Sequence, residues 1–172
     1  MAGLDSLKAR VPDHARDLRI NLGVIAGSTA LTPAQAWTVA VAAAHTARNA
    51  ELVAAVEADA AAHLSPEAIA AGRAAAAIMG MNNIYYRFVH TMGDAAEYGQ
   101  MPAKLRMQVI GKPGIDQTDF ELACLAASAI TGCEMCMRSH EKAVRERGGT
   151  KDAVQDAVRI AAVLHGTAVA LG

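Results

Sequence analysis

Aromatic residues and β-type alternation are scarce in this sequence. Of 172 residues, one is Trp, two are Phe and three are Tyr, and β-branched or aromatic residues do not alternate with polar ones in any run. Alanine, leucine, methionine, glutamate and arginine dominate the long segments, and these residues favour helix. The sequence therefore predicts an all-α fold, and its length suits a single compact domain.

An excess of charge of either sign is also missing. The 16 basic and 17 acidic residues leave a formal net charge of −1 and are dispersed along the chain. No basic surface is expected that would attract phosphate backbones or anionic lipid. Nucleic-acid binding is therefore not expected.

Uninterrupted hydrophobic runs and a leader sequence are not evident either. Arg, Glu or His breaks each alanine-rich stretch before it reaches membrane-spanning length. The segment Met1–Lys8 has no basic cluster followed by an apolar run. We expect no membrane span, no secretory signal and a cytoplasmic location.

Cysteine is too scarce for a framework of structural disulfides, because the chain has only three. Two of them, Cys133 and Cys136, form a Cys-x-x-Cys pair, and His140 follows one helical turn later. Spacings of three and four residues place all three side chains on one helix face. In the cytoplasm such a pair is catalytic, redox-sensing or metal-binding, and we favour a redox dithiol with a nearby base.

Helix boundaries are marked by capping residues and proline. Thr32-Pro33 and Ser65-Pro66 resemble N-caps followed by proline at the first helical position. Gly148-Gly149-Thr150 indicates that one helix ends and the next begins. Residues 112–116 predict a loop that leads into a helix from about 117 to 131.

The chain resembles itself at an offset of 84 to 85 residues. In this register Cys133 falls on Asn49, so only the second half carries the thiol pair. We interpret residues 1–110, approximately, as scaffold and residues 111–172, approximately, as the half with the redox site. Chance similarity between alanine-rich helices is the alternative.

The helix that carries the thiols can also activate them. Cys133 is expected in the first helical turn, where free N–H groups and the helix dipole lower a thiol pKa. His140 is spaced to exchange a proton with Cys136.

Glu121 lies on the preceding helix, which a tight turn at Gly132 could fold back beside the thiols. We predict that Glu121 takes part in a proton relay. The alternative is structural, because Thr118-x-x-Glu121 also matches a capping box that would return the carboxylate to its own helix N-terminus.

Several other polar or sulfur-containing residues are expected in the core. His45 and His165 lie in apolar helical runs and are expected to be hydrogen-bonded core residues. Asn82 and Asn83, in a mostly apolar stretch, need hydrogen-bond partners if they are buried. Cys124 is expected to be a buried apolar residue.

Two alternatives to a catalytic dithiol use the same residues. Cys133, Cys136 and His140 could supply three zinc ligands, although a structural site needs a fourth and no second Cys or His pair is present. The dithiol could also belong to a redox-sensing binding protein.

Several short motifs occur together over nearly the whole chain. They are Asn21-Leu22, the run Ala-Ile-Met-Gly-Met-Asn-Asn-Ile-Tyr-Tyr at 77–86, Pro113-Gly114-Ile115, Phe120-Glu121-Leu122, and Ser128-Ala-Ile-x-Gly-Cys-x-x-Cys136 followed by His140. In combination they resemble the alkyl hydroperoxidase D family of the carboxymuconolactone decarboxylase-like superfamily. The decarboxylase branch of that superfamily, which shares the helical scaffold without a dithiol, is the runner-up.

The resemblance implies an all-helical homotrimer in bacterial antioxidant defence. Such proteins act as lipoyl-dependent reductants of a peroxiredoxin, alkyl hydroperoxide reductase C, and reduce organic hydroperoxides more weakly themselves. Electrons would arrive from NADH through dihydrolipoamide dehydrogenase and a lipoylated acyltransferase. No tightly bound cofactor is expected, because dihydrolipoamide is a reductant carried by a partner protein.

The resemblance also assigns roles to individual residues. It implies that Cys136 is the peroxidatic thiol, which forms a sulfenic acid or a mixed disulfide with the peroxiredoxin. Cys133 would donate a proton and close the Cys133–Cys136 disulfide, while Glu121 and His140 would relay protons. Well-known members carry histidine at the position of Met135, so one relay residue is missing here.

Overall fold

The computed structural model describes residues 2–93 and 97–172, and α- and 3-10 helices are the only regular secondary structure within these ranges. The all-α prediction is therefore confirmed. The α-helices are α1 (Ala2–Arg10), α2 (Asp17–Asn21), α3 (Val24–Gly27), α4 (Pro33–Ala47), α5 (Ala50–Ala60), α6 (Pro66–Met92), α7 (Gln108–Gly111), α8 (Gln117–Thr131), α9 (Glu134–Glu146) and α10 (Lys151–Leu171). Two 3-10 turns, η1 (Asp13–Ala15) and η3 (Tyr98–Gln100), complete the described elements.

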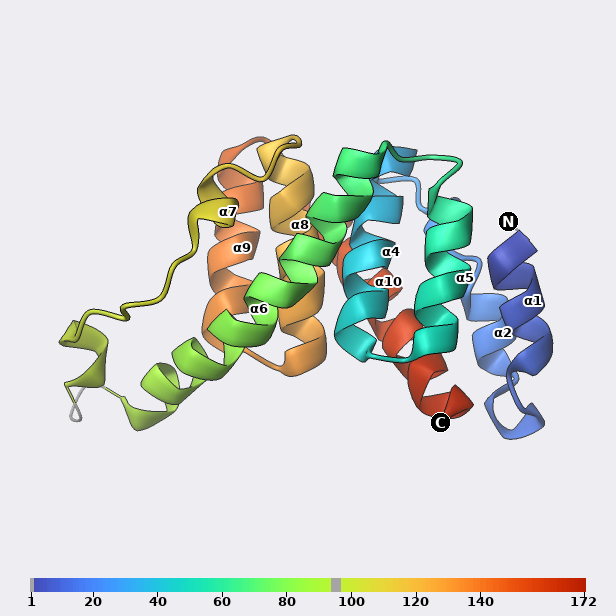
Figure 1. Cartoon of the computed structure of the whole chain (residues 1–172), viewed down its shortest axis with the longest axis horizontal. Helices are drawn as coiled ribbons and strands as arrows, with labels where there is room; N and C mark the ends of the chain where they lie inside the picture. The colour runs from blue at the N-terminus through green and yellow to red at the C-terminus, as the bar shows by residue number, and fades with distance from the viewer. Residues whose placement is uncertain (1, 94–96) are drawn as a thin grey trace.

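Helices α4 and α8 lie side by side at the centre of the molecule (Figure 1). Helix α6 crosses both of them on one face, and α10 packs against both on the other. Helix α9 flanks α8, α5 flanks α4, and α1 covers the outer side of α5. The redox pair at the start of α9 therefore lies at one edge of a helical core.

The centre of the core is built from small side chains. Every residue of α4 from Ala36 to Ala44 is buried, and most of these are alanine or valine. Small residues allow neighbouring helices to approach closely, while larger side chains such as Trp37, Leu122 and Leu164 fill the space between them.

The predicted capping residues begin their helices as expected. Thr32, Ser65 and Thr150 are the N-caps of α4, α6 and α10, and each hydroxyl accepts a hydrogen bond from the backbone N–H three residues later at 3.0 to 3.2 Å. The helix predicted from about 117 to 131 is α8. Local capping chemistry therefore fixes these boundaries.

The helix positions repeat along the chain. Helices α4, α5 and α6 begin at residues 33, 50 and 66, and helices α8, α9 and α10 begin at residues 117, 134 and 151. We refer to α4–α6 as the first helical trio and to α8–α10 as the second. The spacing of the two trios matches the offset at which the sequence resembles itself.

Helix α10 is the one helix in the described part of the chain that is long and apolar enough to cross a membrane. It packs against both α4 and α8, and Ile160 and Leu164 are buried there. Its buried Asp156 accepts a hydrogen bond from the Ser28 hydroxyl at 2.6 Å. These contacts are those of a core helix.

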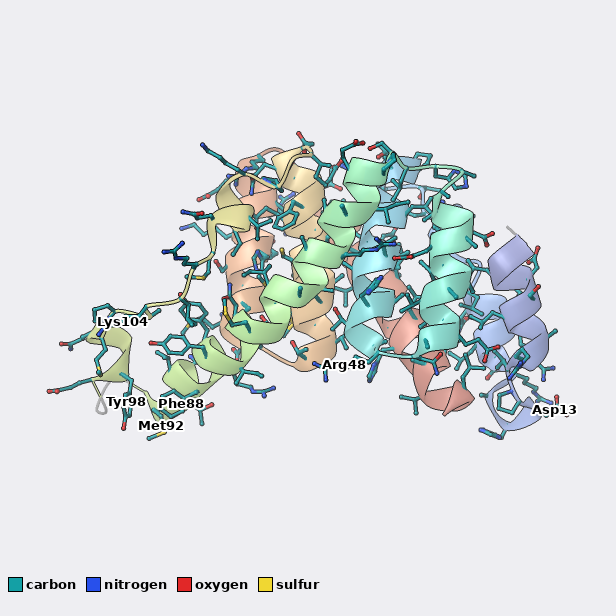
Figure 2. The ribbon with its side chains drawn as sticks, in the orientation of Figure 1. Asp13, Arg48, Phe88, Met92, Tyr98 and Lys104 are labelled. Atoms are coloured by element: carbon teal, nitrogen blue, oxygen red, sulfur yellow. A yellow bond between two sulfur atoms is a disulfide. The ribbon has the colours of Figure 1, made fainter. Side chains whose placement is uncertain are left out.

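The C-terminal end of α6 extends beyond the helical body (Figure 2). Ile84, Phe88 and Met92 follow one another at four-residue spacing there, and all three are exposed. The Phe88 ring lies 5.0 Å from that of Tyr98, which is also exposed. We refer to Ile84, Phe88, Met92 and Tyr98 as the α6 apolar strip.

Candidate active site at the start of helix α9

A left-handed residue between α8 and α9 brings the thiol pair back toward α8. Gly132 ends α8 with φ 70°, a conformation that glycine adopts without steric cost. The next residue, Cys133, has extended backbone, and its N–H donates to the carbonyl of Ser128 at 3.1 Å. Helix α9 then folds back and packs against α8.

Cys133 and Cys136 are joined by a disulfide, with their Cα atoms 5.3 Å apart. Cys133 is the N-cap of α9, and its Sγ accepts a hydrogen bond from the Cys136 N–H at 3.4 Å. Cys133 is fully buried at 0% exposure, whereas Cys136 is 6% exposed and lines a pocket. A reactant in that pocket therefore meets Cys136 first.

Glu121 of α8 and His140 of α9 form a buried pair beside the disulfide. His140 Nδ1 lies 2.6 Å from Glu121 Oε2, and Glu121 Oε1 accepts a hydrogen bond from Gln117 Nε2 at 2.9 Å. The structure thus brings together the four residues that the sequence singled out, namely Cys133, Cys136, His140 and Glu121.

The capping-box interpretation of Glu121 is wrong. Asp116 is the N-cap of α8, and its Oδ1 accepts hydrogen bonds from the backbone N–H groups of Thr118 and Asp119 at 2.8 and 3.3 Å. Glu121 lies too far into the helix to reach that N-terminus, and its carboxylate bonds to His140 and Gln117 instead.

The electrostatic surroundings of Glu121 favour its ionised form. Burial is the largest single influence and raises the pKa, but the hydrogen bonds from His140 and Gln117 and the charges of His140 and Arg147 outweigh it. The pKa of Glu121 is therefore held below its usual value. At neutral pH the carboxylate is ionised.

The second ring nitrogen of His140 faces a methionine from α6. His140 Nε2 lies 3.2 Å from Met79 Sδ. A carboxylate and a thioether are both acceptors, so each ring nitrogen of His140 faces a group that accepts hydrogen bonds. Sequence reasoning did not find this contact, because Met79 lies 61 residues before His140.

Cys136, Glu121 and His140 open onto a pocket of about 390 Å³. Most of its wall is apolar and comes from α6, α7, α9 and the segment before α7. The apolar lining residues are Met79, Tyr86, Met107, Ile110, Met135 and Ala143. The pocket therefore suits a small apolar molecule with one reactive polar end. Met135, beside Cys136 in the chain, is part of this wall.

The structure also tests the predictions that His45, Cys124 and His165 lie in the core. His45 Nε2 lies 2.7 Å from Glu57 Oε1, which confirms the predicted hydrogen bond, but the side chain is 30% exposed and does not lie in the core. Cys124 is fully buried, as predicted. Burial, followed by the charge of Glu121, raises the pKa of the Cys124 thiol, so it stays protonated. The prediction for His165 is wrong, because this side chain is exposed. In an alanine-rich helix the apolar periodicity is too weak to tell the inner face from the outer one.

The neighbouring asparagines also behave differently. Asn83 donates from Nδ2 to Thr131 Oγ1 at 2.7 Å and accepts from Ser128 Oγ at 3.2 Å, as predicted for a buried amide. Asn82 is buried as well, but its Oδ1 has no hydrogen-bond partner among the described residues. The predicted burial of Asn82 is confirmed, whereas a hydrogen-bond partner for its Oδ1 is not found within these residues. A buried acceptor without a partner lowers stability by roughly 1–3 kcal/mol.

A zinc-binding arrangement is not found at the cysteines. Within residues 2–93 and 97–172, no three His, Cys, Asp or Glu side chains gather as possible metal ligands. Both sulfurs of the pair are in the disulfide, and the two nitrogens of His140 face Glu121 and Met79.

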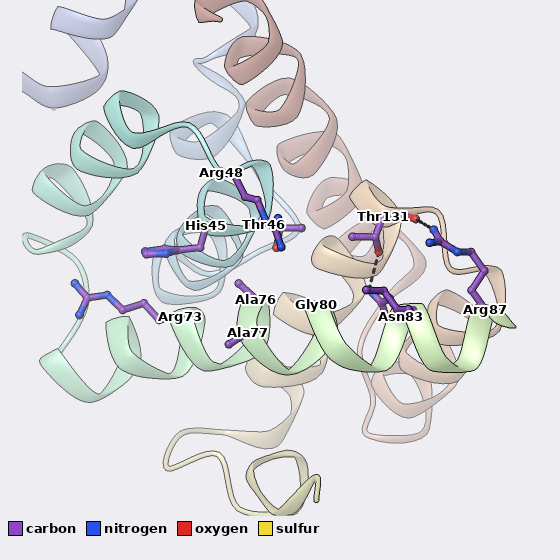
Figure 3. A pocket seen from close by; sticks show the side chains of 11 residues that line it. His45, Thr46, Arg48, Arg73, Ala76, Ala77, Gly80, Asn83, Arg87 and Thr131 are labelled. Atoms are coloured by element: carbon purple, nitrogen blue, oxygen red, sulfur yellow. Dashed lines mark hydrogen bonds between the residues drawn. The ribbon is translucent and has the colours of Figure 1, made fainter. Parts of the chain in front are cut away.

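A second pocket, of about 600 Å³, lies between α4, α6 and the end of α8 (Figure 3). Its cationic side chains mostly have partners already, since Arg73 pairs with Glu57 at 2.6 Å and Arg87 donates to the Thr131 carbonyl at 2.7 Å. No cysteine lines it. The chemistry of the chain is therefore centred on the pocket at Cys136.

Comparison with known proteins identifies relatives of the whole chain. Residues 96–171 match the carboxymuconolactone decarboxylase family. Relatives named alkyl hydroperoxide reductase AhpD include the following three. The Rhodospirillum centenum protein is 51% identical over 98% of this chain and 90% of its own length, and that of Methylocella silvestris is 53% identical over 98% and 94%. The Anaeromyxobacter sp. (strain K) protein is 52% identical over 99% and 91%.

The chain thus has a helical fold and a Cys133–Cys136 disulfide, and its second half matches the carboxymuconolactone decarboxylase family. About half of the residues are identical to those of the AhpD relatives, over nearly the full length of both chains, and this identifies the family. The chain belongs to the alkyl hydroperoxide reductase AhpD family, as the sequence motifs indicated.

Proposed function

We propose that this protein is an antioxidant dithiol oxidoreductase of the alkyl hydroperoxide reductase system. Dihydrolipoamide, carried by a lipoylated acyltransferase, reduces the Cys133–Cys136 disulfide. The dithiol then passes electrons to a peroxiredoxin and, more slowly, reduces organic hydroperoxides itself. The observation that carries the proposal is a buried disulfide that opens through Cys136 into an apolar pocket beside the Glu121–His140 pair.

The oxidative half-reaction begins at Cys136. Its thiolate attacks the terminal oxygen of the hydroperoxide, the O–O bond breaks, and an alcohol leaves after it takes up a proton. Cys133 then attacks the Cys136 sulfenic acid, releases water and closes the disulfide. Two thiols and one hydroperoxide thus give one disulfide, one alcohol and one water. The placement of Cys136 in the pocket supports this assignment.

The reductive half-reaction uses the same geometry. A dihydrolipoamide thiolate attacks Cys136, and Cys133 leaves as a thiolate. The second dihydrolipoamide thiol then releases lipoamide and restores the dithiol. Because Cys133 is the N-cap of α9, the helix N-terminus stabilises its leaving thiolate. The helix dipole therefore serves the leaving group, whereas Cys136 serves as the point of attack.

Glu121 and His140 supply and recover the proton. His140, one turn after Cys136, gives a proton to the departing alkoxide, and the contact of its Nδ1 with Glu121 orients the ring for this transfer. Met135 does not replace a histidine in this role, because a thioether carries no proton.

The assembly expected from the resemblance is a cytoplasmic homotrimer, which we propose for this chain as well. The α6 apolar strip supports self-association, since Ile84 is 65% exposed and Phe88 and Met92 continue the same face. Light scattering on the protein and on Phe88→Glu tests this. We expect the wild-type protein to be a trimer and Phe88→Glu to dissociate. A monomeric wild-type protein would refute the proposed trimer.

NADH consumption tests the proposed function. The assay contains dihydrolipoamide dehydrogenase, lipoamide and cumene hydroperoxide, with and without the peroxiredoxin. We expect wild-type turnover that the peroxiredoxin accelerates, and no turnover for Cys133→Ser or Cys136→Ser. Cys124→Ser is the matched control, because this third cysteine is buried outside the disulfide and should be dispensable. Wild-type protein as inactive as the two serine variants would refute the proposal.

A further inference from the structure

Asn82 and Asn83 are adjacent buried amides with opposite hydrogen-bonding states. Asn83 has a donor and an acceptor partner, in Thr131 and Ser128. Asn82 is 4% exposed, and its Oδ1 is buried without a partner in the part of the chain that the structure describes. Buried polar atoms without partners are rare in folded proteins, so this acceptor calls for a physical explanation.

The position of Asn82 supplies that explanation. Along α6, Asn82 lies between Met79 and Tyr86, at spacings of three and four residues, and all three line the pocket that contains Cys136. Met79 and Tyr86 contribute sulfur and ring surface to the wall. Asn82 is therefore an amide from α6 in the same cavity as the reactive thiol.

We propose that Asn82 binds the peroxide group of the substrate, an inference that rests on the proposed function. Its Oδ1 accepts a hydrogen bond from the terminal O–H of an organic hydroperoxide. The alkyl group then lies against the apolar wall, and the terminal oxygen faces Cys136 Sγ. The orphaned acceptor of the free protein thus acquires its partner when substrate enters.

The hydrogen bond is compatible with the reaction. Cys136 thiolate forms an S–O bond to the terminal oxygen while the O–O bond breaks, so two electrons pass from sulfur to the peroxide. The terminal oxygen keeps its hydrogen and becomes the hydroxyl of the sulfenic acid, which still donates to Asn82. The other oxygen leaves as alkoxide and takes its proton from His140.

Electron uptake from dihydrolipoamide has no such requirement. Attack of a thiolate on the Cys133–Cys136 disulfide involves no O–H group that Asn82 would bind. The two half-reactions therefore respond differently to loss of the amide, and this difference separates substrate binding from a structural role.

The two half-reactions are measured separately on the full-length protein. Reduced protein is mixed with cumene hydroperoxide and its remaining thiols are titrated over time, and oxidised protein is mixed with dihydrolipoamide. For Asn82→Leu we expect the second-order rate constant with hydroperoxide to fall roughly five- to tenfold, as for one neutral hydrogen bond. The rate of reduction by dihydrolipoamide should stay within about twofold of wild type, given the few tenths of a kcal/mol typical of an indirect effect.

Stability provides the second readout. Asn82→Leu removes an unpaired acceptor, so its Tm should equal or exceed that of wild type. The matched control Asn83→Leu breaks two hydrogen bonds, so its Tm should fall. Asn82→Ala gives the same kinetic test if leucine does not fit.

Failure of this inference and failure of the proposed function give different results. Wild-type protein that reacts with neither hydroperoxide nor dihydrolipoamide refutes the proposed function. If wild type reacts with both, the role of Asn82 is overturned in either of two cases: both substitutions leave the hydroperoxide rate unchanged, or they slow both half-reactions equally. A fall in Tm for Asn82→Leu as large as that for Asn83→Leu also overturns it.

Discussion

The two helical trios share the spacing of their helix starts and differ in the side chains placed on those helices. Helix α5 begins after Asn49, whose Oδ1 accepts a hydrogen bond from the Leu52 N–H at 3.0 Å. Helix α9 begins after Cys133, whose Sγ accepts from the Cys136 N–H at 3.4 Å. The same capping position thus holds a structural amide in one trio and a redox sulfur in the other.

The buried faces differ in the same way. Trp37 and Val56 are buried apolar residues of the first trio. The positions 84 residues later are Glu121 and His140, which form the 2.6 Å pair beside the disulfide. Burying charged groups is expensive compared with packing apolar ones, so a buried Glu–His pair at positions that are apolar in the first trio indicates where the chemistry is. The two trios thus share the position of this cap, and the disulfide and the buried Glu121–His140 pair lie in the second.

Exchange of the capping residue should have the largest effect. Cys133→Asn gives α9 the cap of α5, and no disulfide can form, so lipoamide-dependent hydroperoxide turnover should be lost completely. Under reducing conditions its free energy of unfolding should stay within about 1 kcal/mol of wild type, because asparagine is a good N-cap. NADH consumption and urea unfolding measure the two quantities. Unfolded protein would mean that the trios do not share this capping geometry.

Removal of the buried histidine should have the next largest effect. His140→Val leaves the Glu121 carboxylate buried without its main partner, so the free energy of unfolding should fall by roughly 3 kcal/mol. The double variant His140→Val, Glu121→Leu should regain at least about half of this loss, since the buried carboxylate is then removed together with its partner. Urea unfolding measures both. If the loss for the double variant equalled the sum of the losses for the two single variants, Glu121 and His140 would not be coupled.

A second imidazole should sharpen the contrast between the trios. Met135→His places a proton-carrying group in the pocket wall, so hydroperoxide turnover should rise by up to about tenfold, a modest general acid–base effect. Thiol–disulfide exchange with dihydrolipoamide should change less. Single-turnover rates for each half-reaction provide the comparison, and equal effects on both would contradict it.

The first trio should show the smallest effect, at its own Glu–His pair. The hydrogen bond from Arg73 lowers the pKa of Glu57 from 4.5 to about 2, and contacts with His45 contribute to this shift. Burial acts in the opposite direction but is outweighed. A carboxyl group whose pKa is lowered by folding stabilises the folded state at pH values above its ordinary pKa of 4.5. This stabilisation is lost as the pH falls toward about 2. At pH 7, Glu57→Gln should therefore cost about 1 kcal/mol or less, because solvent screens the half-exposed Arg73.

Thermal unfolding as a function of pH checks this last prediction. The Tm difference between wild type and Glu57→Gln should be largest near neutral pH and should disappear near pH 2, about the pKa of Glu57. Arg48→Gly serves as a backbone control in the same trio, since Arg48 has φ 60° and the variant leaves the Glu57 contacts intact. If the Tm difference between wild type and Glu57→Gln grew as the pH fell, ionised Glu57 would not be the form that stabilises the fold.

Much of the fold follows from local residues. Thr32, Ser65 and Thr150 define three helix starts because a hydroxyl that binds the third following N–H needs no help from the rest of the chain. The shared face of Cys133, Cys136 and His140 also follows from helical spacing alone. Family membership follows as well, because the motifs are read directly from the chain.

The tertiary structure decided the contacts that turn these residues into a site. The capping-box motif suggested a local partner for Glu121, whereas packing of α9 against α8 gave it His140, 19 residues away. Packing of α6 then placed Met79 at the imidazole and Asn82 in the pocket, and it left Cys136 rather than Cys133 within reach of a reactant. Helix periodicity and capping act over a few residues, so the sequence determined the helices and the thiol face. Which buried groups meet depends on how separate helices pack, and only the folded chain determines that.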